Sequence, residues 1–255
     1  MGGNQPRDRR LSMRIPRVYI EAPLRCGATL ALPRACAEHL ARVLRHRAGD
    51  ALVLFNGQGG EWEATIASIR RAETTVTIGP HHAIERESPL RVTLAQGLAR
   101  GERMDYTIQK AVELGVTHIV PIAARRSVVQ LEEARAERRL DHWRKVIRQA
   151  CEQCGRNRLP AMEPVVDLPT WLARAPSGVN VLLATAGETA LSDLTLTEPS
   201  LTLLAGPEGG WSEEEVYAAR QAGFLGLRLG PRILRTETAA VTALSAFNSL
   251  WGDLR

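Results

Sequence analysis

The 255-residue sequence lacks any long apolar run, and this absence excludes one class of protein. A helix that spans a membrane needs about 18 or more consecutive apolar residues, and no stretch of the chain approaches that length. The first residues, MGGNQPRDRRLSM, carry charge but no apolar segment of the kind that marks a secretory signal. We therefore expect a cytoplasmic protein without membrane spans.

Two common nucleotide-binding motifs are also missing. The chain has neither the G-x-x-x-x-G-K-S/T run of a P-loop nor a G-x-G-x-x-G after the first strand expected in its second part. A dinucleotide-dependent oxidoreductase is thereby disfavoured. Cysteine is sparse as well, and Cys151 and Cys154 form a lone C-x-x-C without a second pair or a histidine at ligand spacing. Since a structural zinc ion needs four ligands, we expect no metal site.

Lysine is nearly absent, because Lys110 and Lys145 are the only two among 33 basic residues. Arginine makes up the rest, and the net charge is +5. Guanidinium groups bind phosphates in a bidentate manner and stack on bases, so this charge favours a polyanionic partner such as RNA. A bias in genomic base composition also explains the scarcity of lysine, since alanine, leucine and glycine are abundant.

What is present divides into two parts with different patterns. Residues 1–12 are polar and without periodicity, and we expect a disordered extension there. Residues 13–78 contain short apolar runs separated by turn signals, and one amphipathic helix is expected at residues 33–46. The expected strands are residues 18–20, 51–55, 62–69 and 74–78. This pattern predicts a small β-barrel with one helix, and a polar linker follows at residues 79–89.

Residues 90–255 alternate between strand and helix patterns. The expected strands are residues 92–95, 116–121, 162–166, 179–184, 201–205 and 225–229. Helices are expected at residues 102–114, 132–153 and 170–175, after Ser212, and from Thr236 to about Trp251. Strands that alternate with helices form a mostly parallel sheet covered on both faces. The fold class predicted for this part is therefore α/β.

Two Gly-Pro loops in this part have the composition of a ligand site. The first holds Gly206, Gly209 and Gly210, which permit positive φ and a close approach of the backbone to a ligand. It ends at Ser212 and Glu215, which are spaced as a capping box. The acidic first turn of the following helix disfavours a bound phosphate and favours a cationic or neutral ligand.

The second Gly-Pro loop brings Arg232 and Arg235 to the start of the last helix, for which Thr236 is the expected N-cap. We expect this arrangement to deliver one guanidinium group into a cleft. Gly and Pro after a strand are also ordinary turn residues, so the residues alone leave a purely structural interpretation open.

Several segments, taken in order, resemble one known family. GPEGG at residues 206–210 and LGPRILRTETA at residues 229–239 are similar to motifs of the ribosomal RNA uridine-N3 methyltransferases, the RsmE family of the SPOUT superfamily. Residues 96–121 and 152–160 resemble further signatures of this family, and residues 38–52 resemble its PUA-like segment. The resemblance covers nearly all of residues 14–255. It implies a SPOUT-type parallel sheet with a C-terminal trefoil knot, preceded by a PUA-like RNA-binding β-barrel.

The resemblance also implies a cofactor and a substrate. The cofactor is S-adenosyl-L-methionine, and the methyl acceptor is N3 of a specific uridine in 16S ribosomal RNA. The cofactor would lie against the two Gly-Pro loops, with a third wall after residues 179–184. The implied cofactor-binding residues are Thr185, Gly206, Pro207, Glu208, Gly209, Gly210, Leu229, Gly230, Ile233, Leu234 and Thr236.

Methylation of uridine N3 requires a route for the imide proton and a group that stabilises the charge left on the flanking carbonyl oxygens. We expect Arg235 to stabilise that charge and Glu237 to accept the proton. An acid in the first turn of a helix more often interacts with the helix dipole, so a structural role for Glu237 stays open. The sulfonium supplies its own leaving group, and the reaction needs no metal.

Arginines of both parts are expected to hold RNA. The implied RNA-binding residues are Arg17, Arg42, Arg45, Arg47, Arg103, Arg125 and Arg126. The alternative for the helical members is a solvated helix face. This chain departs from the family at residues 124–127, where Ala-Arg-Arg-Ser stands in place of Thr or Ser followed by Glu-Arg-Ser. It therefore has no acid before Arg126.

Two other functions are compatible with the sequence. One is a noncatalytic RNA-binding or ribosome-assembly factor, and the intact segment at residues 229–239 argues against it. The other is a SPOUT methyltransferase that acts on another RNA, and nothing in the residues themselves decides this point. Superfamily likeness further implies a homodimer that acts on the small ribosomal subunit, in which the barrel of one subunit presents RNA to the other's cofactor site.

Overall fold

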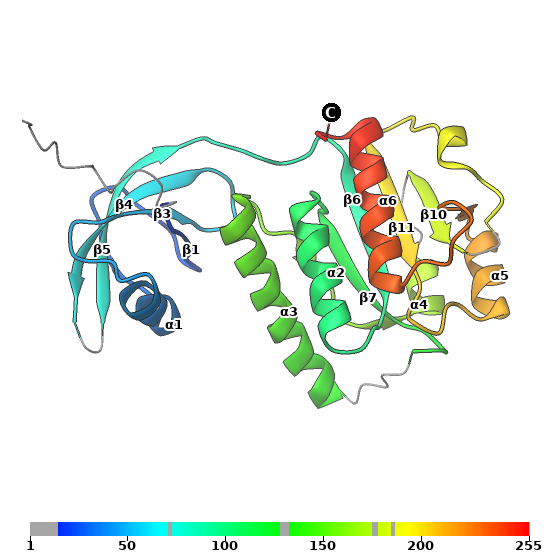
Figure 1. The fold of residues 1–255 in the computed structure, drawn as a ribbon, viewed down its shortest axis with the longest axis horizontal. Helices are drawn as coiled ribbons and strands as arrows, with labels where there is room; N and C mark the ends of the chain where they lie inside the picture. The colour runs from blue at the N-terminus through cyan, green and yellow to red at the C-terminus, as the bar shows by residue number, and fades with distance from the viewer. Residues whose placement is uncertain (1–14, 71–72, 128–132, 175–177, 185–186, 255) are drawn as a thin grey trace, which may run out of the picture. The chain divides into compact units, whose positions relative to one another are not determined.

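The structure is a computed structural model that describes residues 15–70, 73–127, 133–174, 178–184 and 187–254. The chain divides into two compact units, Met1–Glu85 and Arg86–Arg255, which we call unit 1 and unit 2 (Figure 1). Each unit is described by itself. Within the residues described, no helix combines the length and the apolar character that crossing a membrane requires.

As far as the structure describes it, unit 1 is a five-stranded sheet in the order β1-β3-β4-β5-β2. β1 and β3 run parallel, and the other pairs are antiparallel. Alternate residues of β4 and β5, such as Ile66, Val76 and Ile78, point into the core of the unit, as expected for a sheet with one buried face. The strands are β1 Arg17–Tyr19, β2 Thr29–Ala31, β3 Ala51–Phe55, β4 Glu61–Ile69 and β5 Thr74–His82.

Three features of unit 1 differ from the prediction. The sequence does not predict β2, because three residues are too few for a period of two to be recognised. The expected single helix is α1 Arg34–Glu38 followed by a π-helical turn, η1 His39–Val43. β5 continues to His82, so residues 79–82 belong to the strand rather than to the linker. Pro80 is tolerated there because it lies at a register shift between β4 and β5, where the ladder is already interrupted.

Unit 2 contains, among its described residues, a seven-stranded sheet in the order β12-β10-β11-β6-β7-β8, with β9 also paired to β7. Every pair is parallel, which confirms the predicted α/β class. The strand expected at residues 162–166 is two short strands instead. The strands are β6 Arg91–Gly97, β7 His118–Ala123, β8 Ala161–Met162, β9 Val166–Asp167, β10 Val179–Leu183, β11 Ser200–Ala205 and β12 Leu225–Leu227.

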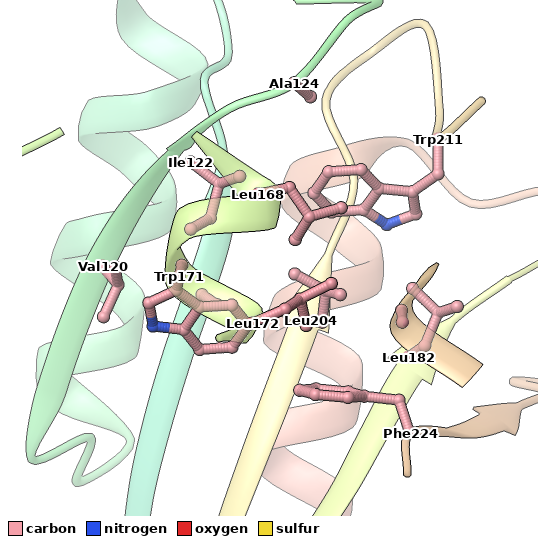
Figure 2. Close-up of a cluster of buried hydrophobic side chains, with 12 residues drawn as sticks. Val120, Ile122, Ala124, Leu168, Trp171, Leu172, Leu182, Leu204, Trp211 and Phe224 are labelled. Atoms are coloured by element: carbon pink, nitrogen blue, oxygen red, sulfur yellow. The ribbon is translucent and has the colours of Figure 1, made fainter. Parts of the chain in front are cut away.

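Helices cover both faces of this sheet. On one face α2 Glu102–Glu113 contacts both α3 Glu133–Cys154 and α6 Thr236–Trp251 (Figure 1). α2 buries Met104, Ile108 and Ala111, which share one stripe of the helix. On the other face α4 Leu168–Leu172 and α5 Glu213–Gln221 pack over a cluster that contains Trp171, Leu204 and Phe224 (Figure 2). A short 3-10 turn, η2 Leu191–Asp193, precedes β11.

Two buried polar networks fix the helices of the first face. Ser88 Oγ donates to Asn248 Oδ1 at 2.7 Å, and Asn248 Nδ2 donates to the carbonyl of Leu114 at 2.8 Å, which joins the end of α6 to the end of α2. Arg156, 4% exposed, donates to the carbonyl of Val112 in α2, to that of Val116 after it, and to the carboxylate of Glu87. The signature at residues 152–160 therefore has a structural task in this unit.

Candidate functional site

A cavity of about 590 Å³ lies in unit 2 at the carboxyl ends of β10, β11 and β12. Ligands of parallel α/β sheets bind at this end of the strands, because the loops that follow the strands meet there. The two Gly-Pro loops form most of its wall, as residues 206–211 and 227–236. Leu183, Ala184, Val216 and Ala239 complete its apolar part, and Arg103 and Arg126 also line it.

The structure gathers most of the predicted cofactor-binding residues around this cavity. Thr185 lies outside the described residues. Arg235 lines the cavity and is exposed, whereas Glu237 is half-buried and is not part of the lining. The predicted cofactor-binding residues that line the cavity are Gly206, Pro207, Glu208, Gly209, Gly210, Leu229, Gly230, Ile233, Leu234 and Thr236. Their roles in binding remain predictions.

Close backbone approaches hold the walls of the cavity together. A Cβ on Gly97 would lie 2.5 Å from Cδ of Pro207, and a Cβ on Gly187 would lie 2.6 Å from the carbonyl carbon of Leu227. A Cβ on Gly209 would lie 2.8 Å from the carbonyl oxygen of Arg126. Glycine is required at these positions because the neighbouring atoms belong to backbone or proline ring. The two loops are thus positioned by steric contact with other strand ends.

Gln96, at the end of β6 and fully buried, joins the two loops through hydrogen bonds. Its Nε2 lies 3.1 Å from the carbonyl oxygen of Gly206, 3.1 Å from Oγ1 of Thr236 and 3.0 Å from the carbonyl oxygen of Gly97. The hydroxyl of Thr236 also donates to the Gly206 carbonyl. Since two of the three neighbours are carbonyl oxygens, the amide nitrogen must face them, and this fixes the orientation of the side chain.

Two predictions about this region have different outcomes. The capping box of α5 is confirmed, because Ser212 Oγ accepts from the Glu215 backbone N–H and Glu215 Oε2 accepts from the Ser212 backbone N–H. The N-cap predicted for α6 is wrong. Arg235 occupies that position, and Thr236 is the first helical residue, with its hydroxyl used to bind the Gly206 carbonyl.

Glu208 presents a carboxylate at the cavity. Its Oε1 accepts from the backbone N–H of Arg100 at 2.9 Å and from Nη1 of Arg103 at 3.2 Å. Burial alone would raise the pKa of Glu208, but these hydrogen bonds and the charge of Arg103 outweigh it and hold the pKa below its ordinary value. Oε2 is buried and has no hydrogen-bond partner among the described residues. The residue that lines the cavity thus keeps one buried carboxylate oxygen without a partner among the described residues.

The arginines predicted to bind RNA have different surroundings. In unit 1, Arg17 forms an ion pair with Glu61, and its guanidinium lies over the ring of Phe55. Its side chain is 9% exposed, so the placement does not support a contact with phosphate. Arg42 is exposed in η1, and Arg45 and Arg47 are exposed in the segment that follows it.

The other predicted RNA-binding arginines belong to unit 2. Arg103 is paired with Glu208, and Arg125 is paired with Glu214 at 3.4 Å. Arg126 lines the cavity. Arg228 was not predicted as a site residue, and Arg232 was named only beside Arg235 at the start of the last helix, yet both line the cavity with Arg235. The guanidinium groups of these last three have no ion-pair partner in the part of the chain that the structure describes.

No group of three His, Cys, Asp or Glu side chains that could hold a metal ion occurs among the described residues. Cys151 and Cys154 lie in the last turn of α3, where the thiol of Cys151 donates to the carbonyl oxygen of Arg158 at 3.7 Å. The lone C-x-x-C is therefore part of a helix in this fold.

Comparison with models of known protein families defines the class of protein. Residues 86–248 match the model described as an RNA methyltransferase domain, and residues 33–78 match the one described as an RNA methyltransferase PUA domain. The parallel sheet, the cavity between Gly-Pro loops and these matches define an RNA methyltransferase with an N-terminal PUA domain.

Individual proteins narrow this class to a family. The chain is 31% identical over 245 residues to the ribosomal RNA small subunit methyltransferase E of Buchnera aphidicola subsp. Schizaphis graminum, an alignment that covers 96% of this chain and 100% of the relative. The Bacillus subtilis protein of the same name is 33% identical over 219 residues, which are 82% of this chain and 86% of the relative. The chain belongs to the ribosomal RNA small subunit methyltransferase E family.

Solved structures of similar proteins support the same family assignment. The ribosomal RNA small subunit methyltransferase E of Neisseria gonorrhoeae, bound to S-adenosyl methionine, is 38% identical with a TM-score of 0.87, and covers 95% of this chain and 100% of its own. A Legionella pneumophila structure with bound cofactor SAM is also 38% identical, with a TM-score of 0.91 and coverage of 94% and 100%.

Proposed function

We propose that this protein transfers the methyl group of S-adenosyl-L-methionine to N3 of a uridine in the 16S RNA of the small ribosomal subunit, and that it does so in the cytoplasm. The observation that carries the proposal is the meeting of both Gly-Pro loops around one cavity at the carboxyl ends of the strands. The relatives solved with this cofactor support the same assignment.

The residues of the cavity fit S-adenosylmethionine. Its volume of about 590 Å³ suits a ligand of that size, and Leu183, Val216 and Leu227 offer an apolar wall to a flat base. The ionised carboxylate of Glu208 suits the cationic part of the cofactor. When bound, the cofactor supplies an electrophilic methyl group on a sulfonium that leaves as a neutral thioether.

Arg235 is the group that we assign to the developing negative charge on the uridine. Its guanidinium lies at the cavity next to the first turn of α6 and has no ion-pair partner among the described residues. It can donate to a carbonyl oxygen beside N3, where charge accumulates as the N3 proton leaves. Glu237 lies outside the cavity lining, so the arrangement does not support proton transfer to its carboxylate. We assign the proton to solvent, and Glu237 to the positive end of the α6 dipole.

The RNA is held by two groups of arginines in this proposal. Arg228 and Arg232 lie at the cavity with no ion-pair partner in the described part of the chain, and they suit phosphates next to the target uridine. Arg42, Arg45 and Arg47 form the second group, exposed around one turn of unit 1. The π-helical turn before Arg45 and the positive φ of 56° at Arg45 are features often found at functional surfaces.

A homodimer is part of the proposal. Apolar side chains are exposed at both ends of α6, because Ile233 is 85% exposed before the helix, and Leu250 and Leu254 are 47% and 48% exposed at its end. Mixing two inactive full-length variants tests whether RNA is presented in trans. One carries Arg42→Glu with Arg45→Glu, and the other carries Arg235→Ala. Restored methylation in the mixture supports a shared site, and an inactive mixture means that each subunit works alone.

Titration calorimetry with S-adenosylmethionine tests the cofactor site. Ala184→Phe places a ring in the cavity, and Ala173→Phe makes the same change at an exposed position at the end of α4. Binding by wild type and by Ala173→Phe, with binding lost in Ala184→Phe, is the expected result. Equal binding by all three would place the cofactor elsewhere. No binding by folded wild type, even with RNA fragments added, would favour a noncatalytic RNA-binding factor.

A further inference from the structure

Trp211 belongs both to the core and to the cavity. It follows the first Gly-Pro loop, is 8% exposed, and packs in the cluster that also contains Leu168 and Leu204. It is also one of the residues that line the cavity. In Figure 2 the six-membered ring of Trp211 is directed toward Leu168, and the nitrogen lies on the side of the indole away from that leucine. The six-membered ring therefore anchors the residue in the core, and the edge with Cδ1 and Nε1 faces the first Gly-Pro loop (Figure 2).

The indole N–H of Trp211 is buried and has no hydrogen-bond partner among the described residues. Buried donors in native proteins are almost always paired, because an unpaired one loses its hydrogen bonds to water without replacement. The indole nitrogen lies against the first Gly-Pro loop, since a Cβ on Gly206 would lie 3.2 Å from Nε1. An unpaired donor in a residue that lines the cavity, next to a loop that also lines it, suits an acceptor atom that arrives with the ligand.

The residues that line the cavity indicate which part of the ligand carries this acceptor atom. Leu183, Ala184 and Val216 line the same cavity and are apolar, whereas Glu208 provides a carboxylate. A flat purine base is the part of S-adenosylmethionine that suits an apolar wall, and its ring nitrogens and the ribose oxygens are acceptors. The cationic part of the ligand suits Glu208 instead.

We infer that Nε1 of Trp211 donates a hydrogen bond to an acceptor atom of the purine nucleoside of the cofactor. This inference rests on the proposed function and adds to it a residue that recognises the nucleoside through a hydrogen bond. Trp211 is then a binding and specificity residue, because a base or sugar without an acceptor at that point would leave the N–H unpaired.

Calorimetric titration of Trp211→Phe with three ligands tests the inference. S-adenosylmethionine, S-adenosylhomocysteine and 5′-methylthioadenosine share the nucleoside, and the last one lacks the amino-acid part. We expect the Kd of all three to rise by roughly fivefold, the effect of one net hydrogen bond. Trp171→Phe is the matched control, because Trp171 is 5% exposed in the same cluster but is not part of the lining of this cavity. It should bind all three as wild type does.

A second variant separates hydrogen bonding from packing. Incorporation of benzothienylalanine at position 211 replaces the N–H by sulfur with little change of volume. It should raise the Kd of the three ligands as Trp211→Phe does. Wild-type affinity in this variant, or a loss limited to the two ligands with an amino-acid part, would overturn the inference and leave the proposed function intact. If folded wild type binds none of the three ligands, the proposed function fails and the inference fails with it.

Discussion

Replacing Gln96 with methionine removes the hydrogen bonds that join the two Gly-Pro loops while keeping the length of the side chain. The amide nitrogen carries two hydrogens and lies 3.0–3.1 Å from three acceptors, so it makes at most two full hydrogen bonds. At about 1 kcal/mol for each net bond, Gln96→Met should lower the free energy of unfolding by about 2 kcal/mol. Urea denaturation of the protein without ligand measures this difference.

A double-mutant cycle with Thr236→Val isolates the network from general packing. Gln96 Nε2 donates to Thr236 Oγ1, and both side chains donate to the Gly206 carbonyl, so the two substitutions act on shared partners. We expect the double variant to be more stable than the sum of the single effects predicts, by about 1 kcal/mol. Purely additive effects, or a Gln96→Met protein as stable as wild type, would refute the network as the link between the loops.

Three further predictions follow from single contacts. Gly97→Ala should lower the free energy of unfolding by about 1–3 kcal/mol, because its Cβ would lie 2.5 Å from Cδ of Pro207; an unchanged urea midpoint would contradict this close approach. Asp167→Ala should cost about 1 kcal/mol at pH 7, because Asp167 caps α4 by accepting from the Thr170 N–H. That hydrogen bond lowers the pKa of Asp167, so the stabilisation by the ionised carboxylate is complete above the ordinary pKa of 3.8 and is lost as the pH falls through the lowered pKa. If Asp167→Ala lowered the free energy of unfolding equally at pH 7 and in strong acid, this role of the carboxylate would be wrong. Glu208→Gln should raise the Kd of S-adenosylmethionine by about tenfold in calorimetry, and that of S-adenosylhomocysteine, which lacks the sulfonium charge, by less. An equal rise for both ligands would mean that the carboxylate does not interact with the sulfonium.

Local patterns predicted the parts of the site that depend on neighbours in the chain. The capping box of Ser212 and Glu215 is a spacing of three residues, and both hydrogen bonds are present. The Gly-Pro loops follow their strands as expected. Their meeting around one cavity came from the family resemblance, because Gly and Pro after a strand fit an ordinary turn equally well.

Local sequence patterns did not predict the contacts between residues that are distant in the chain. Gln96 lies 110 residues from Gly206 and 140 from Thr236, and its one visible signal was a polar residue at the end of an apolar strand. Arg17 was expected to face RNA, yet Glu61, 44 residues away, accepts its hydrogen bond inside unit 1. Such pairs depend on sheet order and strand register, which periodicity does not specify.

The predicted length of β5 was wrong for a related reason. Gly79 and Pro80 carry the composition of a loop, and the strand nevertheless continues to His82. The register shift opposite them, between Trp62 and Ala64 of β4, accommodates a proline without a lost ladder bond. The trefoil knot that the resemblance implies stays a prediction.

The proposed activity is tested by methyl transfer from labelled S-adenosylmethionine to small ribosomal subunits whose 16S RNA lacks N3-methylated uridine. Digestion of the RNA to nucleosides and mass spectrometry identify the labelled product. We expect label in 3-methyluridine, with none formed by Arg235→Ala at equal cofactor affinity. Label in a different nucleoside, or cofactor binding without transfer to the RNA, would contradict it.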